Sequence, residues 1–372
     1  MVAGETSGDM LAAALIGGIG GRWPGVRLAG IGGPQMVAKG FEAWWPSDKL
    51  AVRGYVEVLR HYREIIGIRD KLTARLLSQK PDLFIGVDAP DFNLALEQKL
   101  KANGIKTAHF ICPSIWAWRP ERVEKIRQSV SHVLCIFPFE VELLAQHGIG
   151  ATYVGHPLAG LIPAVPDKAA ARALLGLSES DQVLAILPGS RRSEVNYLAS
   201  RFFEAASLVK QKKHAIQLVV PAIPVLRPFI VEAARNAGVL PSLKILDGQS
   251  HVALAACDVS LIASGTATLE AALFKRPMVI AYNMNWLSWQ IMRRKRLQPW
   301  VGLPNILCRD FVVPEFLQDA ATPAAMATAL LDWLENPAKV EAIQSRFGAL
   351  HELLRRDTTQ LATDAIQKVL QG

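Results

Sequence analysis

Short apolar runs rich in β-branched residues alternate along the chain with longer stretches in which apolar residues recur every three or four positions. The short runs cover residues 26–30, 82–87, 106–112, 130–137, 183–187, 217–220, 243–246, 259–263 and 278–282. Most of them are apolar on both faces, as parallel strands covered by helices on each side are. The alternation therefore predicts an α/β fold made of two doubly wound, Rossmann-like domains.

A group of prolines marks the expected boundary between these domains. Pro157, Pro163 and Pro166 follow one apolar run and precede the next, and such clusters are typical of connecting segments. We place the first domain at residues 1–157 and the second at residues 158–345. Residues 346–372 are predicted to form a helical tail that can pack back across the domains.

Composition adds a surplus of basic charge to this picture. Of 372 residues, 51% are hydrophobic, which supplies enough apolar material for one large or two ordinary cores. Lys and Arg number 41 against 33 Asp and Glu, and the resulting formal charge of +8 excludes an acidic, disordered chain. Because no apolar run approaches the ~20 residues that span a bilayer, we expect no transmembrane helix.

Cysteine usage and the amino terminus bear on the compartment. The four cysteines lie far apart without C-x-x-C spacing, which argues against a disulfide framework and a zinc site. No basic segment leads into an apolar stretch at the amino terminus, so we expect no secretory signal. A reducing cytoplasm fits both observations.

Ligands of doubly wound sheets bind beyond the carboxyl ends of the strands, so the residues that follow each predicted strand carry the candidate chemistry. The first such segment consists of small and polar residues ahead of an apolar helix: Gly4, Glu5, Thr6, Ser7, Gly8 and Asp9. Its amides can hold an anion at the helix start. A capping box between Thr6 and Asp9 explains the same residues, and we weigh the two interpretations equally.

The second segment delivers two carboxylates to the end of a buried strand. Asp88 and Asp91 flank Pro90 directly after the run at 82–87. A carboxylate there can act as a general base, and partial burial would raise its pKa toward the working range. We favour a helix-capping role for Asp91 and disfavour one for Asp88, which lies too early to cap a helix that begins after Pro90.

Two further segments in the second domain have the character of phosphate-binding turns. Gly189, Ser190 and Arg191 follow one strand, and an arginine at a helix start suits a diphosphate. Ser264, Gly265 and Thr266 follow another, with Glu270 about one turn into the next helix. A carboxylate at that position can accept from both ribose hydroxyls, although acidic residues are common in first helical turns for the dipole alone.

Together with the motif His109–Arg119 and the block Gly302-Leu303-Pro304-Asn305, these segments resemble lipid-A-disaccharide synthase, a family of GT-B glycosyltransferases. The resemblance runs nearly end to end, with the motifs in the family's order. It implies two Rossmann-like domains facing each other across a cleft. The family has an apolar run ahead of the Gly4–Asp9 block where this chain has only Met1-Val2-Ala3, so we expect most of the first strand to be missing. Cys112 replaces an expected serine, and we interpret it as a small buried thiol.

The resemblance also implies a reaction. It is the inverting transfer of 2,3-diacylglucosamine from UDP to the 6-hydroxyl of 2,3-diacylglucosamine 1-phosphate, which yields lipid A disaccharide 1-phosphate and UDP. Asp88 matches the proposed catalytic base, Arg191 the arginine near the diphosphate and Glu270 the acid at the ribose. Nucleotide-side positions of the family match Gly189, Ser190, Ser264, Gly265, Thr266 and Asn305. We expect no cofactor and no metal, because an arginine and helix amides can stabilise the leaving diphosphate.

Acylated substrates require contact with a membrane surface, and two segments suit it. Along one predicted helix a single stripe contains Val58, Leu59, Tyr62, Ile65 and Ile66. The second segment places Trp286 and Trp289 beside the basic cluster 293–296, a composition typical of the headgroup zone. An ordinary core-facing helix is the more common cause of such a stripe; the surplus of basic charge and the second segment are what favour membrane contact. We expect a peripheral protein on the inner face of the bacterial inner membrane, with no nucleic-acid role; the sequence is compatible with a homodimer.

Two alternatives remain open on the sequence alone. One is another enzyme for UDP-N-acetylglucosamine-type substrates, such as a peptidoglycan-lipid transferase or an epimerase. The other is a membrane-surface protein that binds a nucleotide without catalysis.

Overall fold

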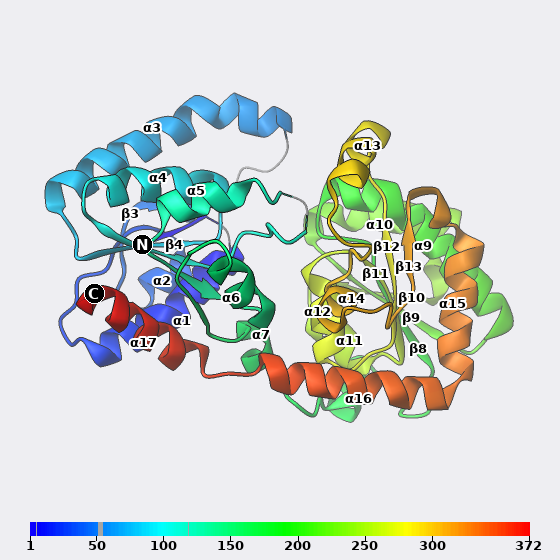
Figure 1. The fold of residues 1–372 in the computed structure, drawn as a ribbon. Coiled ribbons are helices and arrows are strands. Elements are labelled where there is room, and N and C mark those ends of the chain that lie inside the picture. The colour runs from blue at the N-terminus through cyan, green and yellow to red at the C-terminus, as the bar shows by residue number, and fades with distance from the viewer. Residues whose placement is uncertain (5, 51–54, 118) are drawn as a thin grey trace. The chain divides into compact units, whose positions relative to one another are not determined.

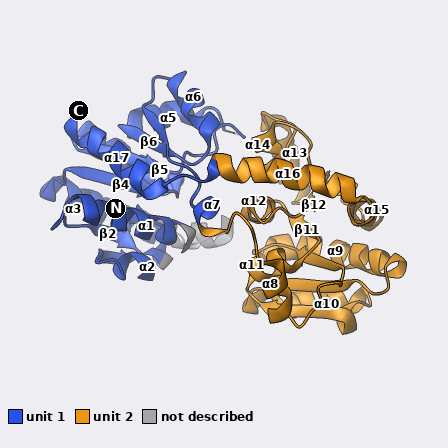
Figure 2. Ribbon diagram, turned by 90° about the horizontal axis from the view of Figure 1, so that it is seen from below, with its two compact units in different colours: residues 1–160, 354–372 blue, residues 161–353 orange. Residues whose placement is uncertain are grey.

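The computed structural model describes residues 1–4, 6–50, 55–117 and 119–372. Two compact units emerge from it: residues 1–160 with 354–372, and residues 161–353 (Figure 2). We predicted divisions at 157/158 and 345/346, whereas the first unit of the structure also contains residues 158–160 and 354–372. Each unit is built around its own parallel sheet.

The sheet of the first unit has the strand order β3-β2-β1-β4-β5-β6-β7, and neighbouring strands in it are parallel. Its strands are β1 (Val2–Ala3), β2 (Ala29–Gly32), β3 (Glu42–Pro46), β4 (Leu83–Val87), β5 (Lys106–Phe110), β6 (His132–Cys135) and β7 (Ala151–Tyr153). The strand order reverses between β1 and β4, which is therefore the topological switch point of this unit.

Helices cover both faces of this sheet (Figure 1). They are α1 (Thr6–Arg22), α2 (Pro34–Val37), α3 (Tyr55–Gln79), α4 (Pro90–Ala102), α5 (Arg122–Ser129), α6 (Pro138–Ala145), α7 (Pro157–Leu161) and α17 (Thr358–Gln371). One core cluster lies between the sheet and helices α3 and α4, with Phe84, Leu72 and Leu96 almost fully buried. Each such side chain contributes about 1.5–3 kcal/mol by leaving water.

The last helix, α17, returns to the first unit and packs against α1 (Figure 1). Arg22 at the end of α1 pairs with Asp364 of α17, and Lys106 Nζ donates to the carbonyl of Leu370 at 2.7 Å. Helix α17 is strongly amphipathic, so packing on the unit buries its apolar face. The predicted helical character of the tail is confirmed.

The second unit repeats the arrangement with the order β10-β9-β8-β11-β12-β13, again with parallel pairs. Its strands are β8 (Val183–Leu187), β9 (Gln217–Ala222), β10 (Leu243–Asp247), β11 (Val259–Ala263), β12 (Met278–Tyr282) and β13 (Glu315–Leu317). Its helices are α8 (Lys168–Leu174), α9 (Arg192–Lys212), α10 (Arg227–Asn236), α11 (Ser250–Ala256), α12 (Thr266–Leu273), α13 (Trp286–Lys295), α14 (Leu303–Cys308), α15 (Pro323–Glu335) and α16 (Pro337–Leu354). Here the switch point lies between β8 and β11. The predicted α/β fold with two doubly wound sheets is confirmed.

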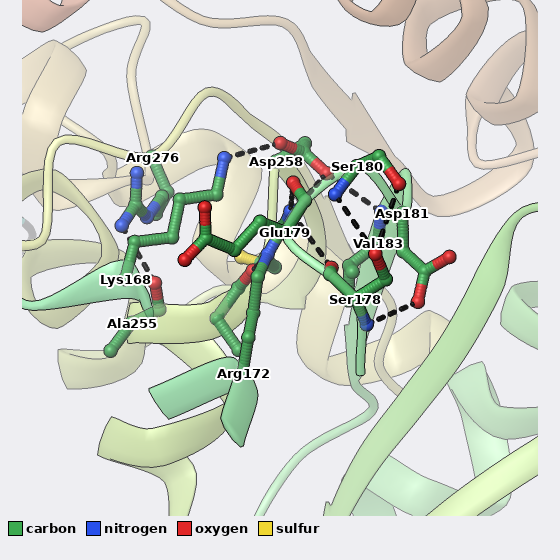
Figure 3. A network of polar contacts seen from close by, with 12 residues as sticks. Lys168, Arg172, Ser178, Glu179, Ser180, Asp181, Val183, Ala255, Asp258 and Arg276 are labelled. Atoms are coloured by element: carbon green, nitrogen blue, oxygen red, sulfur yellow. Dashed lines mark hydrogen bonds and ion pairs between the residues drawn. The ribbon is translucent and has the colours of Figure 1, made fainter. Parts of the chain in front are cut away.

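A polar network clamps the amino ends of β8 and β11 (Figure 3). The Asp258 carboxylate accepts from Arg172 Nη2 at 2.8 Å and from the Val183 amide at 2.7 Å. Arg172 is buried and also donates to the carbonyl of Ala256 at 3.0 Å. Because these bonds satisfy the buried guanidinium, the network ties α8 and α11 to the sheet at the edge opposite the carboxyl ends of the strands.

Candidate functional site

The switch point of the first unit brings together two of the segments selected from the sequence. Val2 pairs with Gly86 and Ala3 with Val87, so β1 and β4 end side by side. A Cβ placed on Gly4 would lie 3.3 Å from the Cβ of Ala89. The Gly4–Asp9 segment and Asp88 therefore share one edge of the sheet, where ligands of this fold class bind.

The backbone at this edge is strained. Asp88 and Ala89 have φ values of +52° and +45°, and Ile111 after the neighbouring strand β5 has +79°. Left-handed conformations cost residues other than glycine about 1–3 kcal/mol each, and they cluster at functional sites. The Asp88 amide donates to the carbonyl of Phe110 at 2.9 Å, which fixes the turn against β5.

Asp88 is half-buried and caps no helix. Helix α4 begins at Pro90 with Ala89 as its N-cap, and no side chain caps it. Asp91 lies inside the first turn, is exposed and pairs with Arg122 of α5. The capping role favoured for Asp91 was therefore wrong, and Asp88, for which we disfavoured such a role, does not cap α4 either.

In the amino-terminal loop the structure gives Asp9 a supporting role. Asp9 is buried, and its carboxylate accepts from the amides of Gly33, Gln35 and Met36 at 2.9, 3.0 and 3.1 Å. Its carboxylate thus caps the start of α2. Gly8 is buried against Ala3. Glu5 lies outside the described residues, as do the side chains of Thr6 and Ser7.

In the second unit, an acidic residue that the sequence analysis did not select accepts hydrogen bonds from the turn after β8. Glu194 accepts from the amides of Ser190 and Arg191 at 3.0 and 3.3 Å, and from Arg191 Nη1 at 3.0 Å. A Cβ on Gly189, which has φ +122°, would lie 2.5 Å from the Cβ of Glu194. Glycine is therefore required here, and the Arg191 side chain beside it is 58% exposed.

The turn after β11 lies next to β8 in the sheet, as the switch point requires. Ser264 Oγ donates to the carbonyl of Val301 at 3.0 Å, while Gly265 and Thr266 are exposed. Glu270 lies 3.7 Å from Nε2 of His251, a residue of α11 that the sequence reading missed. This interaction with Glu270 raises the pKa of His251.

Asn305 is fully buried and its side chain is occupied. Its Nδ2 donates to the Val313 carbonyl and to Glu315 Oε1, each at 2.8 Å, and its Oδ1 accepts from the Val313 amide at 3.0 Å. Glu315 also accepts from the amides of Val301 and Gly302. Burial raises the pKa of Glu315. Asn305 and Glu315 together fix the loop that meets Ser264.

The residues predicted to contact a membrane lie in different environments. Ile65 packs, partly buried, against the core cluster of the first unit, and Ile66 is half-buried. Trp286 is 70% exposed, and Trp289 is half-buried. The side chains of Val58, Leu59 and Tyr62 lie outside the described residues. In the part of the chain that the structure describes, no helix has the length and apolar character needed to cross a bilayer.

A cavity of about 900 Å³ in the first unit lies away from these residues. It is lined by the amino end of β4, the end of α1 and the segment 23–29, with Trp23, Leu83 and Leu370 among its walls. This is the edge of the sheet opposite Asp88. This cavity therefore does not include the predicted site residues.

The sequence matches the family model described as lipid-A-disaccharide synthetase over residues 1–369. The lipid-A-disaccharide synthase of Albidiferax ferrireducens is 67% identical over 377 residues, which cover 100% of this chain and 97% of that protein. The synthases of Verminephrobacter eiseniae and Burkholderia thailandensis are 63% and 51% identical, each aligned over 100% of this chain and 96% of their own length.

Solved structures with the same fold are distant in sequence. A UDP-GlcNAc 2-epimerase from Neisseria meningitidis bound to UDP-GlcNAc gives a TM-score of 0.59 at 12% identity, covering 98% of this chain and 96% of that one. S. aureus MnaA in a co-structure with UDP gives 0.65 at 11%, covering 100% and 96%. WaaG, a glycosyltransferase involved in lipopolysaccharide biosynthesis, gives 0.59 at 14%, covering 100% and 97%. With its two doubly wound sheets and its match from end to end, the chain belongs to the lipid-A-disaccharide synthase family of GT-B glycosyltransferases.

Proposed function

We propose that this chain transfers 2,3-diacylglucosamine from UDP to the 6-hydroxyl of 2,3-diacylglucosamine 1-phosphate, with inversion at the anomeric carbon. The observation that carries the proposal is the position of Asp88, an uncommitted carboxylate on a strained turn at the switch point of the first sheet. Two distant relatives in fold, solved with UDP-GlcNAc and with UDP, support a UDP-linked donor.

In this proposal Asp88 is the general base. The acceptor hydroxyl gives its proton to the Asp88 carboxylate as its oxygen bonds to the anomeric carbon, and the bond from that carbon to the UDP oxygen breaks. The electron pair leaves with UDP. A base that removes the proton in the transition state typically contributes 10²–10⁴-fold to the rate.

The second unit would hold the leaving UDP. Arg191 is exposed beside the turn after β8, so its guanidinium can pair with the diphosphate. Gly265 and Thr266 begin α12 and offer a helix start to the same charge. Glu270, one turn later, would accept from the ribose hydroxyls. These groups stabilise negative charge without a metal ion, so we expect full activity in excess chelator.

Membrane contact is the further part of this proposal, since both lipid substrates reside in a bilayer. Trp286 is 70% and Leu297 55% exposed, and the basic residues between them are exposed as well: Arg293, Arg294, Lys295 and Arg296. Exposed tryptophan beside such a cluster suits an anionic headgroup layer. We propose peripheral binding through this segment, on the cytoplasmic face of the inner membrane.

The direct test is to incubate the purified protein with both acylated substrates and to identify the products by mass spectrometry. The proposal requires a β-1,6-linked disaccharide 1-phosphate and UDP in equal amounts, in buffer with or without EDTA. A panel of acceptors, acylated and not, distinguishes the alternatives. The proposed function would be wrong if the protein transferred the sugar to an unacylated sugar or to a peptidoglycan lipid. It would also be wrong if the protein epimerised UDP-N-acetylglucosamine without any transfer.

A further inference from the structure

A buried polar cluster lies next to the turn that carries Asp88. His109 on β5 and Glu97 on α4 are both 0% exposed, and His109 Nδ1 lies 2.8 Å from Glu97 Oε1. Asn93, one turn earlier on α4, is equally buried. Gly86 is paired with His109 in the sheet, and a Cβ there would lie 2.3 Å from Glu97 Oε1. Strand β4 thus has no side chain at the point where the Glu97 carboxylate enters.

The polar groups of this cluster do not stabilise the fold. Within the part of the chain that the structure describes, Asn93 Oδ1, Glu97 Oε2 and His109 Nε2 are buried without a hydrogen-bond partner. Each such group costs about 1–3 kcal/mol. Replacing a buried ion pair with apolar residues of similar volume is often neutral or stabilising. Because these unpartnered polar groups destabilise the fold, we interpret the cluster as serving the neighbouring turn that carries Asp88.

The cluster is linked to Asp88 through both its backbone and its charge. Asn93 Nδ2 donates to the Asp88 carbonyl at 2.8 Å and to the Val2 carbonyl at 3.4 Å, so it ties the ends of β4 and β1 together. Burial lowers the pKa of His109, but the charge of Glu97, the hydrogen bond to Glu97 and, least of the three, the charge of Asp88 together raise it. The imidazole therefore responds to the carboxylate at the sheet edge.

We propose that Asn93, Glu97 and His109 are positioning residues for Asp88: Asn93 holds the left-handed turn, and a protonated His109 balances the charges of Glu97 and Asp88. The inference rests on the proposed function, in which Asp88 receives the acceptor's proton and later releases it to water. His109 keeps its own proton throughout. Its positive charge offsets the buried Glu97 carboxylate, so that the base does not lie beside an uncompensated negative charge.

Other charged groups on the elements around β5 have partners elsewhere. Asp91 of α4 pairs with Arg122 of α5. On β6, His132 Nε2 lies 2.8 Å from Thr152 Oγ1, and burial lowers its pKa. On α17, Asp364 pairs with Arg22, while Lys368 acts on His132 and Asp364. Glu97 and Asp88 are the carboxylates whose charges raise the pKa of His109.

The proposal predicts how the pH profile of turnover changes when the charges are altered. In His109→Gln the buried Glu97 carboxylate loses its cation, and a nearby negative charge disfavours a second one on Asp88. The acidic limb of kcat/KM should move up by about one pH unit, with roughly tenfold slower turnover on that limb and little change in KM. In the double variant Glu97→Gln/His109→Gln neither charge remains, so the limb should return toward its original position.

A matched control separates positioning from general loss of packing. Leu96 is the neighbour of Glu97 on α4 and is 0% exposed. Leu96→Ala should lower the melting temperature without moving the acidic limb. The proposal is overturned if His109→Gln leaves the limb in place, or if the double variant is displaced as far as the single one.

A second measurement does not depend on turnover. The side-chain nitrogen signals of His109, followed by NMR in isotope-labelled protein, should lose their proton at lower pH in Asp88→Asn than in the unchanged protein. Identical titrations would overturn the inference even in an active transferase. Conversely, a shifted titration in a protein that forms no disaccharide would leave the cluster's coupling to Asp88 intact and refute the proposed function instead.

Discussion

The main-chain amide of Ser190 donates to the carboxylate of Glu194 at 3.0 Å. This contact places a negative group of the protein at the turn where the sequence predicted a diphosphate. Glu194 also pairs with the Arg191 guanidinium at 3.0 Å. A diphosphate bound at this turn, as we propose, would share Arg191 with Glu194. The carboxylate that caps the helix therefore lowers the affinity of the turn for an anion.

Glu194→Gln should strengthen UDP binding while weakening the fold. Removing the negative charge beside Arg191 favours an anionic ligand, and we expect the Kd for UDP to fall about three- to tenfold. Loss of the carboxylate cap should lower the free energy of unfolding by about 1 kcal/mol. Titration calorimetry and urea unfolding measure the two effects. Glu204→Gln, an exposed change on the same helix, should alter neither; weaker UDP binding in Glu194→Gln would contradict the account.

Gly86→Ala should disturb the Asp88 edge from within the sheet. The new Cβ would lie 2.3 Å from Glu97 Oε1 and 3.0 Å from the Cβ of Asn93, so the buried Glu97 side chain, or α4 with it, must shift. Overpacking of this kind costs roughly 1–3 kcal/mol, and turnover should fall with it. Gly20→Ala in α1 is the control, because nothing lies within 4 Å of its Cβ. There, alanine should stabilise the helix by about 0.5–1 kcal/mol. Equal stability of the two variants would refute the steric argument.

His156 should make the fold sensitive to mild acid. Burial lowers its pKa from 6.5 to about 4, and its Nδ1 accepts from the Leu158 amide at 3.2 Å. The unfolded chain therefore takes up the proton first, and stability falls as the pH drops from about 6.5 to 4, by roughly 3 kcal/mol in all. His156→Asn keeps a side-chain acceptor for that amide and removes the titration. Urea unfolding should show that the free energy of unfolding rises less, or falls more, with pH between 4 and 6.5 in His156→Asn than in the unchanged protein. Equal slopes would exclude His156 as a source of the pH dependence.

Glu140 should act in the opposite direction. Burial raises its pKa from 4.5 to about 8, against hydrogen bonds from the Phe137 amide and Trp116 Nε1, both at 3.0 Å. Since the folded protein keeps this proton longer than the unfolded chain, stability falls as the pH rises from 4.5 to 8, by roughly 5 kcal/mol at most.

Glu140→Gln should remove this loss, so between pH 5 and 8 the slope of its free energy of unfolding against pH should be more positive than that of the unchanged protein. At low pH this variant should be less stable than the unchanged protein, because the amide nitrogen of Gln cannot accept a hydrogen bond, whereas both oxygens of the protonated Glu140 carboxyl can. Glu142→Gln, an exposed change on the same helix, should leave the profile unaltered. A wild-type slope in Glu140→Gln would show that Glu140 does not titrate in this range.

The interior of both sheets was predictable because its strands are apolar at nearly every position. The runs at 183–187, 259–263 and 278–282 became β8, β11 and β12 with the predicted bounds. The missed strands lie at the sheet edges or are very short. Strands β7 and β13 have three half-buried residues each, and β3 has the sequence EAWWP with exposed positions at both ends. Because their residues are only partly buried, these strands lack the alternation of apolar and polar residues that would distinguish them from loops.

For the candidate site, the sequence identified residues that follow strands but not their partners. Asp88 and Arg191 were found by their place in the chain, whereas Glu97, His251 and Glu315 come close to site residues only through the packing of separate elements. One signal was available: His109 is a polar residue inside an otherwise buried strand, and burying it requires a partner. The register that pairs it with Gly86 is a property of the sheet, and no local pattern encodes it.

The central claim is that Asp88 removes the proton of the acceptor hydroxyl. Turnover of both acylated substrates by Asp88→Asn, compared with the unchanged protein at equal UDP occupancy, tests it most directly. The account predicts that the disaccharide forms at least a hundredfold more slowly in the variant while the Kd for UDP stays the same. Turnover within a few-fold of the unchanged protein would show that another group is the base.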